Sequence, residues 1–354
     1  MTTIFSELKK DLLDPDTIQK HLLPWYDANQ RMLPWRALPG KEPNPYHVWL
    51  SEIMLQQTTV PTVIPYFLNF IRLWPTVQDL SHASLDDILH AWQGLGYYAR
   101  ARNLFKCAQE ITMHYEGIFP RLESTLLTLP GIGPYTAAAI AAIAFGKNTS
   151  PVDGNIERVL SRVYAIHVPL PGSKPLLQAL ARHHTPLHRA GDYAQALMDL
   201  GSTICTPKKP MCNICPLINF CRAFQKRDPE NYPFKEPSPL KPTRLLDAFW
   251  IEDGSNSLLL EKRPPNGLLG GLVMIPIPLL NKNETNPFFR EGASPLKGIV
   301  SHTFTHFHLK VRVLKSSVLK GNLSLSENQF WYPLSDLSHQ ALPTLMKKIV
   351  RHVT

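Results

Sequence analysis

The spacing of hydrophobic and polar residues changes once along this chain of 354 residues. Up to about residue 225, apolar positions recur every three or four residues, the spacing of amphipathic helices, and short loops separate the periodic segments. The expected helices cover residues 17–29, 47–58, 62–73, 85–95, 102–115, 122–129, 135–145, 156–164, 175–184 and 190–201. Residues 1–225 should therefore form an all-α domain.

Residues 226–243 interrupt this pattern. Four prolines fall within ten residues there, which favours a stiff and extended linker. After it the hydrophobic spacing becomes two, as in half-buried strands. Apolar runs at 248–251 and 257–260 flank a D-G-S-N turn sequence, which is a hairpin signal, and residues 308–313 alternate polar and apolar side chains. With a closing helix near the C-terminus, residues 244–354 should form a smaller α+β domain.

The chain is basic, with 37 Lys and Arg against 28 Asp and Glu and a net charge of +9. This balance favours a polyanionic partner such as nucleic acid. The first 14 residues carry charges throughout, so no signal peptide is visible, and no run of about 18 apolar residues could span a membrane. We expect a cytoplasmic protein.

A buried carboxylate is predicted at Glu52, in the sequence S-E-I-M-L-Q-Q-T-T-V of residues 51–60. Its neighbours are apolar on nearly every side, as in a buried helix. Loss of water disfavours the charged form and raises the pKa, so Glu52 can stay protonated near neutral pH and act as a general acid. The alternative is a glutamate in the first turn of the helix, where the helix dipole stabilises it.

A glycine turn between two helices follows, in the sequence L-P-G-I-G-P of residues 129–134. Gly131 and Gly133 allow a tight turn, and the proline starts the next helix. The exposed amides and the helix N-terminus can bind a phosphate oxygen, so residues 122–145 form a candidate helix–hairpin–helix. The alternative is a simple connection between helices.

Asp153, in the sequence V-D-G-N, is the second candidate catalytic carboxylate. An aspartate before a glycine most often caps a helix or stabilises a turn. Together with Glu52, however, it would supply one protonated and one ionised carboxyl group. Such a pair suits cleavage of a glycosidic bond through an oxocarbenium-like state.

Four cysteines form a metal-ligand pattern rather than a disulfide framework. They are Cys205, Cys212, Cys215 and Cys221, with the spacing C-x6-C-x2-C-x5-C. Four thiolates without a histidine fit either a tetrahedral zinc ion or a [4Fe–4S] cluster. Zinc modules usually pair two C-x2-C units, and only one is present in this 205–221 loop, so the spacing favours iron–sulfur. Crowded free thiols also suit a reducing compartment.

The sequence G-L-G-Y-Y-A-R at residues 94–100 places two aromatic residues beside glycines. This arrangement suggests a loop that inserts a ring between bases. The alternative is a tyrosine packed into the core.

Together these motifs resemble the helix–hairpin–helix DNA glycosylases and, among them, the MutY-type adenine DNA glycosylases. The resemblance covers essentially the whole chain and includes two further motifs, L-P-W-R at residues 33–36 and H-T-F-T-H-F-H at residues 302–308. It implies an enzyme that removes adenine mispaired with 8-oxoguanine or guanine in double-stranded DNA. It also implies one [4Fe–4S] cluster on the four cysteines, and we expect a monomer.

The resemblance also implies roles for single residues. Glu52 would protonate N7 of the flipped adenine, and Asp153 would stabilise the sugar cation or a covalent intermediate, with Asn155 in the same pocket. Further positions implied to contact the two bases are Arg31, Arg36 and Asp199 near the adenine pocket, and Gln57, Thr58, Leu95 and Tyr97 beside 8-oxoguanine.

Tyr135 distinguishes this chain from related lyases. Relatives resembling endonuclease III have a lysine at this position, which forms a Schiff base with the sugar. Tyrosine has no amine, so we expect a monofunctional glycosylase in which Tyr135 hydrogen-bonds Asp153.

The C-terminal part resembles the Nudix-like domain that recognises 8-oxoguanine in this family. The matching stretches are R-P-P-N-G-L-L-G-G-L at residues 263–272 and the loop of Phe304, Thr305 and His306, in which Thr305 replaces the usual serine. The glutamate-rich helix that holds magnesium in Nudix hydrolases is absent from the sequence after residue 271, so we expect no pyrophosphatase activity.

Two rival functions remain open at this point. One is an endonuclease III-like glycosylase and lyase acting on oxidised pyrimidines, which Tyr135 and the C-terminal domain disfavour. The other is a non-catalytic iron–sulfur sensor that binds DNA, which the presence of both Glu52 and Asp153 disfavours.

Overall fold

The computed structural model describes residues 12–38, 40–237, 239–264, 267–278, 293–318, 323, 325–340 and 342–354. The sequence in which no signal peptide is visible begins outside these described residues. Part of the stretch where no Nudix helix is expected also lies outside them. By its contacts the chain divides into two compact units, of which one comprises Met1–His82 with Asn103–Pro237 and the other Ala83–Arg102 with Ser238–Thr354.

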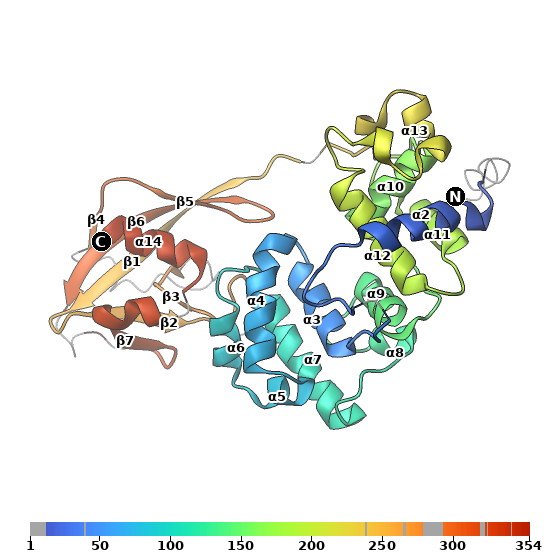
Figure 1. Cartoon of the computed structure of the whole chain (residues 1–354). Coiled ribbons are helices and arrows are strands. Elements are labelled where there is room, and N and C mark those ends of the chain that lie inside the picture. Colours follow the sequence, from blue (N-terminus) through green and yellow to red (C-terminus); the bar gives the residue numbers. More distant parts are fainter. Residues whose placement is uncertain are drawn as a thin grey trace. The chain divides into compact units, whose positions relative to one another are not determined.

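The first unit is helical, as the spacing of apolar residues predicts (Figure 1). Its longer helices are α2 (Pro15–Asn29), α3 (Pro45–Leu55), α4 (Val60–Leu73), α9 (Pro134–Phe145), α10 (Gly154–Tyr164), α11 (Lys174–His184), α12 (Ala190–Thr203) and most of α7 (Ala99–Tyr115). Shorter pieces are α5 (Val77–His82), α8 (Glu123–Leu126), α13 (Arg222–Gln225) and the 3-10 turns η1 (Cys212–Ile214), η2 (Ile218–Phe220) and η3 (Pro229–Asn231). Helix α5 escapes prediction because its 6 residues are too few to show a helical period. Within the residues that the structure describes, no helix is both long and apolar enough to cross a membrane.

Helix α9 holds the neighbouring helices at close range. It is apolar all round, and its residues from Thr136 to Ala142 are buried. The small side chains let α9 pack closely against α3 and α12. A Cβ on Gly191, in the first turn of α12, would lie 2.6 Å from the Ala142 carbonyl oxygen, so the approach of the two helices requires glycine there. Helices α3, α9 and α12 therefore form a frame whose backbone has little freedom.

A second core anchors α10 to this frame. Ile18 and Leu22 of α2, Leu160 of α10 and Leu200 of α12 are fully buried in one cluster. Each such side chain contributes roughly 1.5–3 kcal/mol to stability when it is buried. The start of α10, where Asp153 lies, is thereby held by packing against α12 and α2.

The segment expected to be an extended linker is packed at its start. Tyr232 is buried with Ala165 and Ala223 in a small cluster, and Phe234 packs against it. The prolines predict extension, but the two aromatic rings add apolar surface that the helical unit covers. Strand β1 begins only at Thr243.

The second unit contains a mixed sheet. Its strands are β1 (Thr243–Asp253), β2 (Ser257–Lys262), β3 (Val273–Met274), β4 (Ser294–Pro295), β5 (Val300–Thr303), β6 (His308–Val318) and β7 (Gln329–Pro333). Their order is β3-β2-β1-β6-β4, with β5 paired to β6 and β7 paired to β2. Strands β1 and β6 run parallel, with Thr243 opposite His308. The predicted hairpin is the antiparallel β1–β2 pair, and the predicted alternating strand is β6.

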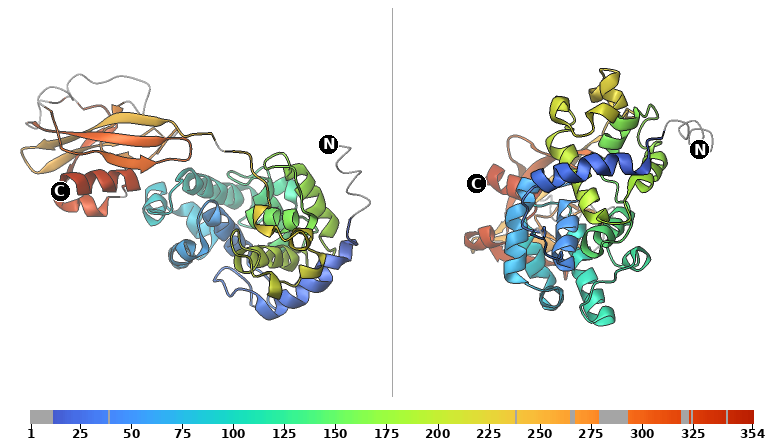
Figure 2. Two further views of the ribbon diagram at one scale, coloured as in Figure 1. Left: turned by 90° about the horizontal axis from the view of Figure 1, so that it is seen from above. Right: turned by 45° about the vertical axis from the view of Figure 1, so that its right-hand side comes forward.

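The predicted closing helix is α14 (Thr344–Val353), which follows the 3-10 turn η6 (Leu334–His339) and lies along the sheet in the left view of Figure 2. Met346 and Ile349 of α14 share a core with Trp250 of β1 and Leu260 of β2. The α+β architecture expected for this part of the chain is therefore confirmed.

The second unit also includes α6 (Leu85–Ala91) and the loop that follows it. The Gln93 side-chain amide donates to the carbonyl oxygens of Gln340 and Leu342, at 3.3 and 3.0 Å. Lys262 forms an ion pair with Asp86 of α6 at 3.0 Å. Hydrophobic spacing carries no information about such polar contacts, so the sequence-based bounds assign this segment to the helical domain.

Candidate active site

Glu52 lies in the last turn of α3, whose first turn is capped by the Asn44 side chain. Every residue of this helix from Tyr46 is buried except His47 and Leu55, and Glu52 itself is 7% exposed. Burial raises the pKa of Glu52 to about 7; the nearby Asp153 also raises it, while the hydrogen bond from Tyr135 and the charge of Arg36 lower it. The helix-dipole alternative is excluded, because the stabilising end of a helix for an anion is its first turn.

Tyr135 begins α9 directly after Pro134, which occupies the first helical position. Its hydroxyl group donates a hydrogen bond to Glu52, so the expected partner, Asp153, is wrong for this structure. Desolvation and the two nearby carboxyl groups raise the pKa of Tyr135 well above its ordinary value. The hydroxyl therefore remains a donor, and it can stabilise the carboxylate that Glu52 becomes after losing its proton.

Asp153 caps helix α10. Its carboxylate accepts from the backbone N–H of Ile156 and from the side-chain amide of Asn155, both at 2.8 Å. Burial raises the pKa of Asp153, and these two donors lower it. Both donors favour the charged carboxylate and partly offset burial, so Asp153 is better suited than Glu52 to the ionised state. The structural and the catalytic interpretations of Asp153 are thus compatible.

A single cavity of about 730 Å³ brings most of the predicted residues together. The predicted residues on its wall are Arg31, Arg36, Glu52, Gln57, Thr58, Tyr135, Asp153, Asn155 and Asp199. They come from α3, α9, α10, α12 and two loops, so the packed frame of helices creates the site. A cavity that holds two carboxyl groups of unlike environment can perform general acid catalysis next to a stabilised cation.

Arg36 and Asp199 form an ion pair in this wall. The Arg36 Nη1 and Nη2 atoms donate to the two oxygens of Asp199 at 2.6 and 2.8 Å, and the backbone N–H of Arg31 donates at 3.1 Å. Asp199 has no exposed surface. A bidentate ion pair of this kind fixes the relative orientation of its two side chains, so it attaches the loop at residues 30–36 to α12.

Sequence reasoning missed Arg158, which connects the active site to the cysteine loop. Its Nη2 atom donates to Asn155 Oδ1 at 2.8 Å and to the Gly201 carbonyl at 2.6 Å, and its Nε atom donates to the Cys205 carbonyl at 2.7 Å. A Cβ on Gly201 would lie 2.6 Å from the Asn155 Cβ, so this glycine lets α12 approach the site. The available signal was a pair of arginines, 158 and 162, four residues apart on a largely buried helix.

The four loop cysteines are free, half-buried and border one small cavity. In the described part of the chain, no three Cys, His, Asp or Glu side chains are already grouped closely enough to hold a metal ion. Burial raises the pKa of Cys215 to about 12, and the three other thiols raise it further. Arg162, which is 1% exposed, donates to Cys205 Sγ at 3.3 Å and to the Thr206 carbonyl at 2.8 Å. The four thiols share one cavity with the buried arginine, whose positive charge favours thiolate ligands over neutral thiols.

The remaining predicted residues lie outside this cavity. Gly131, with φ +77°, and the exposed Gly133 form the turn before α9, in keeping with a separate phosphate site. Leu95 is 5% exposed and belongs to the core, whereas Tyr97 is 50% exposed with φ +47°. The core alternative is thus excluded for Tyr97, and direct base contact is disfavoured for Leu95.

The F-T-H loop joins β5 to β6. Phe304 stacks on Phe307 with ring centroids 4.9 Å apart, so it supports the loop, while Thr305 and His306 are exposed. Within the second unit, the Tyr97 hydroxyl and Thr305 Oγ1 are hydrogen-bonded at 3.2 Å. Two separate sequence motifs predicted contacts with 8-oxoguanine, one through Tyr97 and the other through Thr305. These residues are 208 positions apart in the sequence but are neighbours in the structure.

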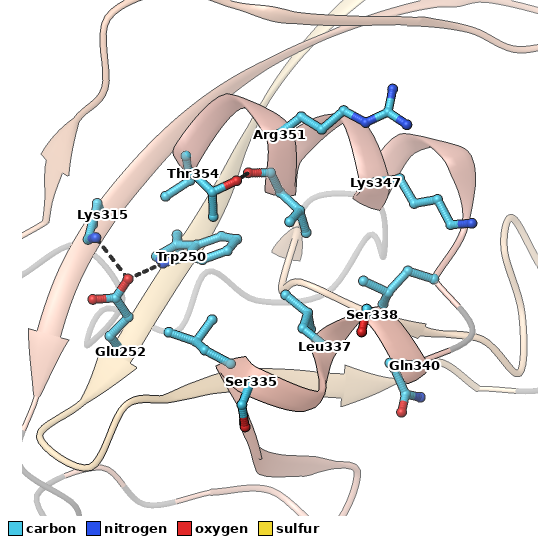
Figure 3. Close-up of a pocket in the computed structure, with 14 residues that line it drawn as sticks. Trp250, Glu252, Lys315, Ser335, Leu337, Ser338, Gln340, Lys347, Arg351 and Thr354 are labelled. Atoms are coloured by element: carbon cyan, nitrogen blue, oxygen red, sulfur yellow. Dashed lines mark hydrogen bonds and ion pairs between the residues drawn. The ribbon is translucent and has the colours of Figure 1, made fainter.

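The second unit has a cavity of its own, of about 430 Å³, between β1, β6, η6 and α14 (Figure 3). Lys315 Nζ and Trp250 Nε1 both contact Glu252 Oε1, at 2.8 and 2.6 Å, as the dashed lines in Figure 3 show. Hydrogen bonds from these two side chains outweigh burial and lower the pKa of Glu252. Because this carboxylate is charged and already paired, the cavity is a poor candidate for acid catalysis.

Two family models match the chain. Residues 50–182 match the HhH-GPD superfamily of base excision DNA repair proteins, and residues 247–352 match the NUDIX domain.

Adenine DNA glycosylases of several organisms are similar to nearly the whole chain. The rat (Rattus norvegicus) protein is 35% identical, over 97% of this chain and 79% of its own length. That of Buchnera aphidicola (subspecies Schizaphis graminum) is 36% identical, over 93% of this chain and 96% of its own length. The human protein is 34% identical, over 97% and 75%.

Solved structures resemble the helical part. A thermostable thymine-DNA glycosylase matches with a TM-score of 0.54 and 29% identity, over 60% of this chain and 97% of that chain. A non-covalent endonuclease III–DNA complex matches with a TM-score of 0.50 and 24% identity, over 61% and 99%, a similarity that concerns the fold alone.

Proposed function

The chain belongs to the adenine DNA glycosylases of base excision repair, and we propose that it hydrolyses the N-glycosidic bond of adenine mispaired with 8-oxoguanine or guanine in double-stranded DNA. The product is an abasic site. One observation carries this proposal. The buried Glu52, whose pKa is about 7, lines the same cavity as Asp153, whose carboxylate caps helix α10.

Glu52 is the general acid of this reaction. A base leaves its sugar more readily once protonated, and protonation of N7 by Glu52 provides that activation. As Glu52 becomes charged, the Tyr135 hydroxyl and the guanidinium of Arg36 stabilise its carboxylate. The acid thus loses its proton inside a buried site that is already arranged for the resulting charge.

Asp153 stabilises the positive charge that develops on the sugar. Its hydrogen bonds from Ile156 and Asn155 favour its ionised form and fix its direction, and Arg158 in turn fixes Asn155. A carboxylate next to an oxocarbenium-like carbon can stabilise it by charge or by transient bonding until water attacks.

The enzyme is monofunctional in this proposal. Tyr135 occupies the position where a lyase needs an amine, and its raised pKa leaves a neutral hydroxyl group there. Without a Schiff base, elimination of the phosphate strand has no efficient route. The DNA strand therefore stays intact after the base is released.

The cysteine loop would hold one [4Fe–4S] cluster through Cys205, Cys212, Cys215 and Cys221. Four thiols border one cavity, and their spacing with a single C-x2-C pair supports this choice over common zinc sites. When bound, such a cluster supplies cross-links that order its loop. Arg158 donates to the carbonyl of Cys205 and to the side chain of Asn155, so an ordered loop would also hold Asn155 in place.

Recognition of the mispair is assigned to two regions. Gly131 and Gly133 would bind the DNA backbone through their amides, and Thr305, His306 and Tyr97 would contact 8-oxoguanine opposite the flipped adenine. We propose that residues 226–243 link the helical glycosylase domain to the C-terminal domain that recognises 8-oxoguanine. The net charge of +9 supports binding to cytoplasmic, nucleoid DNA, and we propose that the protein acts there as a monomer.

A single-turnover assay with excess enzyme tests this proposal on three duplexes, containing A:8-oxoguanine, A:guanine and an oxidised pyrimidine. We expect free adenine from the first two and product strands that break only on heating in alkali. Cleavage of the pyrimidine duplex with strand scission would favour the lyase, and DNA binding without base release would favour the sensor. Glu52→Gln is the matched inactive control.

A further inference from the structure

A second cavity, of about 300 Å³, lies across a shared wall from the catalytic cavity in the first unit. The wall consists of side chains that line both cavities, namely Trp35, Arg36, Val48, Ile143 and Gln195. We name this second space the rear cavity. Its exposed lining residues are Asp27, Leu38, Gly40, Lys41 and Arg189, whereas those of the catalytic cavity are Gln57, Thr59, Gly154 and Ser202. The two cavities therefore open to solvent at different places.

One side chain of the shared wall can move without breaking a strong contact. Arg36 is held by two hydrogen bonds to Asp199, and Val48 is 3% exposed within α3. Gln195 is only half-buried, and its hydrogen bond to the Gly191 carbonyl is long, at 3.4 Å. Separating α9 from α12 would disrupt their close packing at Gly191, whereas rotation of the Gln195 side chain disrupts no backbone contact, so this rotation is the simplest way to join the cavities.

The rear cavity suits a flat, neutral, polar molecule. Gln30 and Gln195 each offer a donor and an acceptor, and the Tyr26 hydroxyl, whose pKa burial raises to about 12, stays a donor. Most of the charged lining residues are paired, since Arg189 donates to Asp192 at 2.8 Å and to Asp27 at 3.1 Å and Arg36 donates to Asp199, while Lys41 is exposed. An apolar cavity of about 150 Å³ accommodates benzene, so a volume of about 300 Å³ has room for the two fused rings of a purine.

We propose that the rear cavity receives the cleaved purine base and lets it leave while the abasic strand still covers the catalytic cavity. This inference rests on the proposed function: after the bond to the sugar breaks, the abasic sugar remains at the front opening and adenine lies on the inner side. Adenine offers one amino donor and several ring acceptors, which match the carboxamides and the phenol of the rear cavity. Base release then does not wait for dissociation of the DNA.

The test fills the rear cavity and follows two events separately. Ala37 lines the rear cavity but not the catalytic one, so Ala37→Phe adds a ring there. Met32→Phe, at an exposed position of the same loop outside both cavities, is the matched control. A duplex carrying radiolabelled adenine opposite 8-oxoguanine is mixed with excess enzyme. Acid quenching measures bond cleavage, and rapid ultrafiltration measures adenine free in solution.

In the wild type and in Met32→Phe, we expect adenine to appear in solution at the same rate as the glycosidic bond is cleaved, while the duplex stays bound. In Ala37→Phe, cleavage should stay within about twofold of wild type and release should fall by about tenfold, because a packed ring must move aside. Ala37→Leu should have a smaller effect in the same direction, and its cleavage rate shows that the variant folds. Release as fast as cleavage in Ala37→Phe would overturn the proposal, as would wild-type adenine that waits for the duplex to dissociate.

A second measurement separates this inference from the proposed function. Labelled free adenine is dialysed against the enzyme loaded with a duplex containing a stable tetrahydrofuran abasic analogue, which requires no catalysis. Adenine should bind this complex in the wild type and in Met32→Phe but only weakly in Ala37→Phe. Absence of binding to the wild-type complex, or equal binding to Ala37→Phe, would refute the rear cavity as a base site even in an active enzyme.

Discussion

Replacing Glu52 by glutamine should end adenine excision and also stabilise the folded protein at alkaline pH. The carboxyl group is 7% exposed, and burial raises its pKa from the ordinary 4.5 to about 7. Glutamine has nearly the same shape and can still accept the hydrogen bond from Tyr135. It carries no charge, so the variant avoids the penalty of burying a carboxylate.

The size of this effect follows from the pKa. A rise from 4.5 to about 7 corresponds to about 3 kcal/mol between the two protonation states. Because the folded pKa is the higher one, the wild type is fully stable below about pH 4.5 and loses stability as the pH rises through about 7. The variant should therefore exceed the wild type by about 3 kcal/mol at pH 8 and by less than about 1 kcal/mol at pH 5.

Guanidinium unfolding followed by tryptophan fluorescence between pH 5 and 8 measures this difference. The control is Glu42→Gln at an exposed position, which should match the wild type at every pH. Single-turnover excision by Glu52→Gln should fall by roughly 10²–10⁴-fold while duplex binding persists. Equal stability of variant and wild type at pH 8, or a stability gain that does not change with pH, would show that Glu52 ionises without a burial penalty.

Three further predictions concern the metal site, the lyase reaction and the damaged base. The protein purified without oxygen should be yellow-brown with about four irons, and Cys212→Ser should lose them; stoichiometric zinc without broad visible absorption would contradict the cluster. Borohydride should trap no protein–DNA adduct during excision, because Tyr135 supplies no amine, whereas trapping at the level of a lyase would contradict a monofunctional enzyme. His306→Ala should reduce the preference for 8-oxoguanine over guanine by up to about tenfold, the value of one hydrogen bond, and Thr305→Ser should be nearly neutral; an unchanged preference in His306→Ala would move recognition to Gln57, Thr58 and Tyr97.

The burial of Glu52 could be predicted because the residues beside it along the chain are apolar. The capping role and the catalytic role of Asp153 could both be predicted, since a V-D-G-N sequence is a local signal and the pairing with Glu52 adds the chemistry. In the structure the carboxylate that caps α10 also lines the cavity that contains Glu52, so the two roles are compatible. Local sequence thus carries much of the information about what these two carboxyl groups can do.

The hydrogen-bond partner of Tyr135 could not be predicted in the same way. It depends on how α9 is rotated against α3 and α12, and that rotation is set by packing of small side chains that look alike in the sequence. Arg158 was missed for a similar reason, because its partners lie more than 40 residues away on α12 and the cysteine loop. The different environments of Leu95 and Tyr97 could not be predicted either. Positive φ angles at Gly96 and Tyr97 turn the Leu95 side chain inward and the Tyr97 side chain outward.

The pH dependence of adenine excision at subsaturating DNA tests the central claim most directly, because this second-order rate reports the free enzyme. The acid must be protonated, so the rate should be highest below about pH 7 and fall about tenfold per pH unit above it. On the acid side, protonation of Asp153, whose pKa burial raises, should lower the rate again. A rate that stays constant from pH 6 to 9, or one that rises through pH 7, would contradict proton donation by Glu52.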